Sequence, residues 1–140
     1  MVKAKKTNEK RLVTAALPYV NNIPHLGHIV GSHLPGDIFA RYCRSRGYDT
    51  LYIGGTDEHG TPALLAAREY GVSLNKFCSK IYGIHKRIYD WFNISYDNFS
   101  RTSKPVHHKL TQEFFKEVQK NGYITGSSVK QFYCAHDKMF

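Results

Sequence analysis

Two histidines three residues apart, His25 and His28, mark the part of the sequence best suited to bind a phosphate group. They follow an apolar run over residues 11–17, which we predict to be a β-strand buried on both faces because its apolar residues alternate little with polar ones. Pro18 ends this run because proline cannot donate a hydrogen bond to a neighbouring strand. From Leu26 onward apolar residues return at helical spacing, so both imidazoles lie on one side of a helix start. The unpaired backbone N–H groups of a helix start, together with two imidazole donors, can stabilise phosphate charge.

Gly27 stands between the two histidines and has no Cβ atom, so a flat nucleotide base could lie against the backbone there. Taken alone, a histidine pair at this spacing is explained as well by a solvent-exposed pair or by an incidental metal pair. A second motif is needed to choose between these interpretations.

The second motif follows another short apolar strand, which we predict over residues 50–53. Gly54 and Gly55 come next and predict a sharp backbone turn or a close approach to a ligand. Asp57 and Glu58 then bring negative charge to the carboxyl end of the strand, where ligands bind in open α/β sheets. The alternative is that one of these carboxylates only favours the start of the next helix.

Together the two motifs resemble the amino-terminal part of the catalytic domain of methionyl-tRNA synthetases, a class I aminoacyl-tRNA synthetase family. The likeness rests on Leu-Pro-Tyr and His-Leu-Gly-His within residues 17–28 and on Gly-Thr-Asp-Glu-His-Gly-Thr-Pro at residues 55–62, and it covers residues 11–140. Related synthetases for other amino acids share His-x-Gly-His but have different residues before it. The resemblance implies an α/β fold: a Rossmann-like parallel sheet with flanking helices, the first half of the class I synthetase nucleotide-binding fold.

The resemblance also implies a reaction, the ATP-dependent activation of methionine to methionyl-adenylate and its transfer to tRNA(Met), with ATP and Mg²⁺ as cofactors. By this likeness the catalytic residues are His25 and His28, which stabilise charge on the ATP phosphates. The implied ATP-binding residues are Pro18, His25, Gly27 and His28, and the implied methionine-binding residues are Leu17, Tyr19 and Asp57. Asp57 would accept the methionine ammonium group in a charge-assisted hydrogen bond.

The likeness suggests three segments: a basic tail over residues 1–10, the first half of the catalytic domain over 11–122, and the start of a zinc-type connective insertion over 123–140. In the insertion, Cys134 is followed three residues later by Asp137, where some family members have a second cysteine. A structural zinc site usually has two cysteine pairs. We therefore predict no metal ligands in this chain, and zinc only in the full-length family context.

Two features of the family are missing from the sequence, the Lys-Met-Ser-Lys-Ser loop and a helical anticodon-binding domain. We therefore expect an amino-terminal fragment or one half of a split enzyme, which needs a complementing carboxyl-terminal half and is not active alone. The alternative is a non-catalytic, synthetase-like module that binds tRNA, nucleotide or a synthetase partner.

Composition is consistent with a cytoplasmic protein that contacts a polyanion. The 140 residues carry a net charge of +9, which suits contact with tRNA. No apolar run approaches 18 residues, so we predict no membrane span, and the amino terminus lacks a signal-peptide core. Of the three cysteines, Cys43 and Cys78 fall on apolar helix faces and are predicted core thiols, which suits a reducing compartment.

The rest of the sequence alternates between helical and strand patterns. The first helix should break at Pro35 and resume over residues 37–46, with Gly47 as its cap. The other predicted elements are helices over 62–70, 74–92 and 105–121, a strand over 97–101, and short strands over 123–125 and 129–133.

Apolar spacing also predicts which side chains of the two longest helices point inward. In residues 74–92 these are Leu74, Phe77, Ile81, Ile84, Ile88 and Trp91. In residues 105–121 they are Leu110, Phe114, Phe115 and Val118, with His107 and His108 at the surface and Gly122 as the helix stop.

Overall fold

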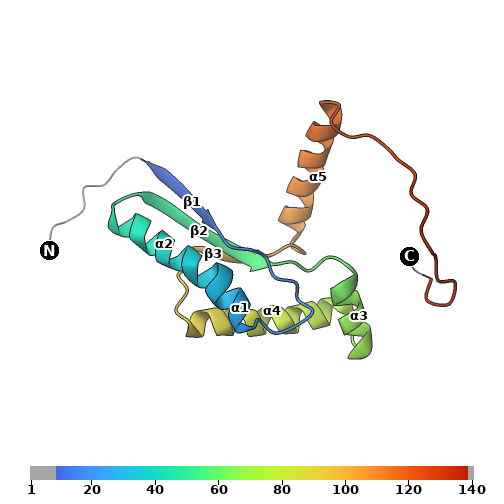
Figure 1. Cartoon of the computed structure of the whole chain (residues 1–140), viewed down its shortest axis with the longest axis horizontal. Coiled ribbons are helices and arrows are strands. Elements are labelled where there is room, and N and C mark those ends of the chain that lie inside the picture. Colours follow the sequence, from blue (N-terminus) through green and yellow to red (C-terminus); the bar gives the residue numbers. More distant parts are fainter. Residues whose placement is uncertain (1–8, 139–140) are drawn as a thin grey trace. The chain divides into compact units, whose positions relative to one another are not determined.

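A computed structural model describes residues 9–138 of the chain (Figure 1). The elements are β1 (Lys10–Thr14), α1 (Leu26–His28), the π-helical segment η1 (Ile29–His33), α2 (Leu34–Ser45), β2 (Asp49–Thr56), α3 (Thr61–Glu69), α4 (Leu74–Trp91), β3 (Asn98–Arg101) and α5 (Pro105–Lys120). The chain forms two compact units, one ending at His108 and the other beginning at Lys109. Of the predicted tail over 1–10, residues 1–8 lie outside the described residues, and Lys10 already belongs to β1.

The first unit is built on a parallel three-stranded sheet in the order β1-β2-β3, which confirms the predicted α/β class. Val13 pairs in register with Tyr52, and both side chains point into the main core. Ala40 of α2 and Tyr89 of α4 pack in the same core, so both helical crossovers cover the same face of the sheet. This arrangement follows from the strand order, because consecutive right-handed crossovers in one direction place their helices on one side.

The opposite face of the sheet is exposed, so the prediction that β1 is buried on both faces is wrong. Leu12 is 64% exposed and Leu51, its partner in β2, is 49% exposed. The reason is topological, because both crossovers lie on the other face. β1 also ends at Thr14, three residues earlier than predicted.

The chain stays helical across Pro35, so the predicted break there is wrong. The Leu34 N–H bonds to the carbonyl of Ile29, five residues back, and this π-type bond closes η1. Pro35 is the second residue of α2 and directly follows this π-helical segment, so its missing N–H falls where the regular bonding between residues four apart is already interrupted. Gly47, with a φ of +84°, follows the end of α2 as predicted.

α3, α4 and β3 form where the sequence predicts them. Phe77 and Ile81 of α4 are buried, as are Cys43 and Cys78. Trp91, in contrast, is 79% exposed, so its predicted inward position is wrong. It is the last residue of α4, and its ring packs edge-on against Phe92 instead of in the core.

Two predictions about the second unit are wrong. None of the α5 side chains is buried, and Phe114 is 73% exposed, because this unit offers no second element for the apolar side of the helix. The strands predicted over 123–125 and 129–133 do not form, since no strand of this unit is available to pair with them. Gly122, with a φ of +77°, follows the helix end as predicted. No helix among residues 9–138 is long and apolar enough to cross a membrane.

Candidate functional site

His25 and His28 lie side by side at the start of the first helix. His25 is the N-cap of α1, and its Nδ1 accepts a hydrogen bond from the Gly27 N–H at 3.0 Å. His28 Nδ1 accepts from the His25 N–H at 3.2 Å, so the two residues form a reciprocal capping box. Their rings stack with centroids 3.9 Å apart. The two imidazoles therefore lie on the same side of the helix start, as their spacing predicts.

The capping box also fixes which ring nitrogen of each histidine can donate. Because both Nδ1 atoms accept from the backbone, each neutral ring carries its proton on Nε2. His25 is exposed and His28 is half-buried. Two Nε2–H donors on stacked rings therefore stand at a helix start, an arrangement that suits an anion.

Gly27 is required by the ring of His25 itself. A Cβ atom at position 27 would lie 2.8 Å from Cε1 of His25, so a larger residue would displace the imidazole. From the sequence alone, the only reason for a glycine at this position is room for a nucleotide base. The structure adds a second reason, the packing of the N-cap side chain.

Main-chain bonds hold residues 17–19 against the end of β2. The Asp57 N–H donates to the Pro18 carbonyl at 2.9 Å, and the Val20 N–H donates to the Asp57 carbonyl at 3.2 Å. Tyr19 and Asp57 thereby form an isolated parallel bridge. Leu17 and Tyr19 both stay about half exposed, at 51% and 50%. The predicted methionine-binding residues are thus gathered at the carboxyl ends of two neighbouring strands.

The two adjacent carboxylates have different roles. Glu58 is 3% exposed, and its carboxylate accepts from Arg101 Nε at 2.6 Å and from the Ser103 hydroxyl at 2.5 Å. Burial raises the pKa of Glu58, but the hydrogen bonds from Arg101, Ser103 and Thr56 outweigh it and the net pKa is lowered. Glu58 is therefore an anion already neutralised inside the fold.

Asp57 is half-buried and meets only uncharged donors among the described residues. Its Oδ1 accepts from the His59 N–H at 3.2 Å and from the Thr102 hydroxyl at 3.4 Å. The carboxylate charge of Asp57 is therefore free to pair with an external cation. The motif alone does not distinguish Asp57 from Glu58, and only the family resemblance singled out Asp57. Both missed Arg101, because no local pattern shows which carboxylate an arginine 43 residues away will meet.

Gly54 and Gly55 do not form the predicted turn, because β2 continues to Thr56. A Cβ atom at Gly54 would lie 2.5 Å from the Tyr96 ring, and one at Gly55 would lie 2.8 Å from the Ser100 carbonyl oxygen. These glycines therefore allow close packing against β3 and the residues before it. The pair of glycines signalled a close approach, but the approaching group belongs to the protein itself.

His33, the last residue of η1, is a buried histidine that sequence reasoning missed. His33 Nε2 lies 2.9 Å from the Tyr89 hydroxyl, and its Nδ1 lies 2.5 Å from the Tyr96 hydroxyl. Tyr52 donates to the His33 carbonyl at 2.7 Å. Burial lowers the pKa of His33 to about 4, so the ring is neutral at pH 7.

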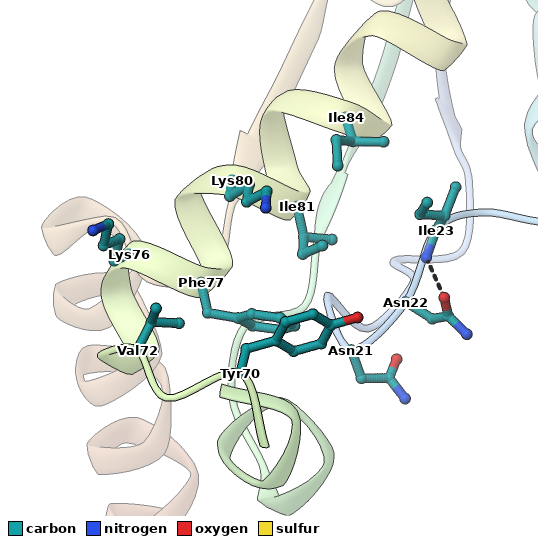
Figure 2. Close-up of a pocket in the computed structure, with 10 residues that line it drawn as sticks. All are labelled: Asn21, Asn22, Ile23, Tyr70, Val72, Lys76, Phe77, Lys80, Ile81 and Ile84. Carbon is teal, nitrogen blue, oxygen red and sulfur yellow. Dashed lines mark hydrogen bonds between the residues drawn. The ribbon is translucent and has the colours of Figure 1, made fainter. Parts of the chain in front are cut away.

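A pocket of about 480 Å³ lies beside the loop that joins Tyr19 to His25. Figure 2 shows it between α4 and the loop of Asn21, Asn22 and Ile23. None of the predicted site residues lines it. The His85 ring of α4 also holds this loop, because His85 Nε2 lies 2.9 Å from the Asn22 carbonyl. The predicted site residues therefore lie outside this pocket.

The residues predicted near a zinc-type insertion do not complete a metal site. Cys134 Sγ lies 3.1 Å from an Asp137 carboxylate oxygen. Within residues 9–138 no group of three or more histidine, cysteine or acidic side chains could hold a metal ion. Two donors fall short of the four ligands of a structural zinc site.

Comparisons with known proteins find similar sequences over most of the chain. Residues 11–140 match the family described as tRNA synthetases class I (M). A methionine–tRNA ligase of Borrelia duttonii is 50% identical over 132 residues, which cover 94% of this chain and 18% of that protein. A cytoplasmic methionine–tRNA ligase of Saccharomyces cerevisiae is 48% identical over 130 residues, which cover 92% of this chain and 17% of that protein.

A solved structure is similar to the chain in fold. The methionyl-tRNA synthetase of Mycobacterium tuberculosis in complex with methionyl-adenylate superposes with a TM-score of 0.79 at 32% sequence identity. The superposition covers 81% of this chain and 22% of the mycobacterial chain. The chain thus spans less than a quarter of each protein with which it is compared.

Proposed function

Because the chain belongs to the class I methionyl-tRNA synthetase family, we propose that it forms the amino-terminal part of the catalytic site of a methionine–tRNA ligase. In this reaction the methionine carboxylate attacks the α-phosphorus of ATP, which gives methionyl-adenylate and releases pyrophosphate. The methionyl group then passes to tRNA(Met). The chain spans 17% of the yeast relative and 18% of the Borrelia relative, so the rest of the site would come from a complementing carboxyl-terminal half.

The observation that carries this proposal is the pair of Nε2–H donors on His25 and His28. Their Nδ1 atoms accept hydrogen bonds from the backbone, so each ring has its Nε2–H available as a donor without a change of tautomer. Donors held in place stabilise charge that develops on a phosphate in the transition state, and no nucleophilic side chain is needed. Gly27 and Pro18 would complete the ATP-binding surface.

Methionine would bind at the bridge between Tyr19 and Asp57. The free carboxylate of Asp57 offers a partner for the ammonium group. Tyr19 and Leu17 offer half-exposed apolar surface for the thioether side chain. Ammonium and side chain would thus be held at the strand ends, with the carboxylate directed to the ATP phosphate.

Mg²⁺ would enter with ATP. Magnesium prefers oxygen ligands, and the imidazoles of His25 and His28 are not suited to hold it. The net charge of +9 favours contact with tRNA(Met). The yeast relative is named as cytoplasmic, and we propose the same compartment for this protein.

The proposal is tested by a chimera in which residues 11–140 of this chain replace the matching segment of the yeast relative. Methionine-dependent exchange of pyrophosphate into ATP measures adenylate formation. We expect the chimera to catalyse exchange with methionine and not with leucine or valine. The matched control is the same chimera with His25→Ala and His28→Ala, in which exchange should fall to background.

A chimera that folds and binds tRNA but gives no exchange would contradict the catalytic proposal. That result would favour the alternative function, a synthetase-like module that binds tRNA, nucleotide or a synthetase partner without catalysis.

A further inference from the structure

His59 and His108 bring their rings together although 49 residues separate them in sequence. Their Nε2 atoms lie 3.1 Å apart, and the ring planes are tilted by 45°. His59 lies two residues after Asp57, in the loop that follows β2, and His108 lies in the first turn of α5. Both residues are exposed, so the gap between the two nitrogens is open to solvent.

This spacing matches that of two imidazoles on one metal ion. Zinc–nitrogen bonds are about 2.0–2.1 Å long, so two nitrogens 3.1 Å apart would subtend an angle of roughly 95–102° at the ion. That range lies between the square-planar angle of about 90° and the tetrahedral angle of about 109°. The separation of the two nitrogens therefore already suits one ion, and each ring has to turn its lone pair from the other nitrogen towards that ion. Groups that are already close together favour affinity.

The chemistry of the pair also fits. Without an ion, one ring must donate its Nε2 proton, and His59 Nε2 also lies 3.3 Å from the Thr102 carbonyl. When an ion binds, each ring directs the Nε2 lone pair to it and keeps its proton on Nδ1. Because both rings are exposed, the Nδ1–H groups can donate to water.

We propose that His59 and His108 form a two-imidazole binding site for a divalent first-row transition metal of the Zn²⁺ and Cu²⁺ class, with water as the remaining ligands. The proposal uses neither Cys134 nor Asp137, and it does not rest on the proposed synthetase reaction. A bound ion would tie the first turn of α5 to the loop that carries Asp57.

The test is calorimetric titration of the 140-residue chain with Zn²⁺ and with Cu²⁺. His59→Gln and His108→Gln should each weaken one binding event by on the order of tenfold or more, because each removes one of two protein ligands. The matched control is His107→Gln, which removes the adjacent exposed histidine of the same helix turn and should change the affinity by less than about twofold. Mg²⁺ should give no binding at this site.

The proposal is overturned if His59→Gln and His108→Gln bind both ions as the unchanged chain does, or if His107→Gln weakens binding as much as they do. Circular dichroism checks that each variant keeps its fold. If His59→Gln does not fold, the His108→Gln variant alone tests the proposal, because His108 is exposed. Nitrogen couplings in the Cu²⁺ electron paramagnetic resonance spectrum should indicate two imidazoles, and one in either variant.

Discussion

Tyr19 and Asp57 form an isolated parallel bridge beyond the ends of β1 and β2. The bridge extends the pairing of the two strands past their last regular residues, and it uses the Asp57 backbone for both of its hydrogen bonds. The bridge thus positions the Asp57 side chain, but the side chain itself takes no part in the hydrogen bonds of the bridge. An aromatic ring and a free carboxylate consequently share one edge of the sheet.

Asp57→Asn should weaken methionine binding in the yeast chimera by on the order of tenfold or more, while the KM for ATP stays within about twofold. Asparagine keeps an oxygen that can accept from His59 and Thr102 and loses only the charge opposite the ammonium group. Methionine titration at saturating ATP measures the effect. An equal loss for both ligands would instead assign Asp57 to the structure of the loop.

His25→Asn should slow pyrophosphate exchange in the chimera by on the order of 10²-fold, with a small effect on methionine affinity. Asparagine is a good N-cap residue, so the helix start keeps its side-chain acceptor and loses only the Nε2 donor. His28→Ala should have a similar effect on the rate. A rate within about threefold of the unchanged chimera would show that His25 does not donate to the phosphate.

Gly55→Ala should destabilise the chain by about 1–3 kcal/mol, because the new Cβ atom would lie 2.8 Å from a backbone oxygen of β3 that cannot rotate away. Gly31→Ala is the matched control. Its Cβ atom would meet no atom within 4 Å, so its free energy of unfolding should be unchanged or higher by up to about 1 kcal/mol. Urea unfolding measures both. A neutral Gly55→Ala variant would contradict the packing role of this glycine.

His33 should make the fold less stable as the pH falls. Its pKa is lowered by burial from an ordinary 6.5 to about 4, so between these values the unfolded chain binds more protons than the folded chain. The stabilisation is complete above about pH 6.5 and is lost towards pH 4, with an upper limit of about 3 kcal/mol. Burial lowers the pKa of His85 too, which acts in the same direction.

Imidazole NMR signals isolate the contribution of His33 from that of the carboxylates. Between about pH 8 and pH 5 its ring signals should not shift in the folded chain, whereas in concentrated urea they should titrate near 6.5. A midpoint near 6.5 in the folded chain would refute the buried, neutral state of this ring.

The sequence predicted well what depends on neighbours in the chain. The helix start at His25, the helix ends before Gly47 and Gly122, and the presence of a strand before Pro18, although not its end, each follow from residues a few positions apart. The sequence did not predict burial correctly where burial depends on whether another element packs over an apolar side chain. Leu12 and Phe114 have the apolar character of core residues, yet the described residues of their own units place nothing over them. Side-chain pattern alone cannot show whether a covering element is present.

The sequence by itself determined the family, the α/β class and the residues of the two motifs, because these rest on local spacing and on residue types. Only the tertiary structure decided which carboxylate remains free. Glu58 is neutralised by Arg101, 43 residues away, and Asp57 is not. Tertiary structure likewise decided that His33 is buried against Tyr96, 63 residues away, while His59 and His108 meet at the surface. The charge and tautomer of a side chain depend on partners that the fold brings from distant positions, and no local pattern records them.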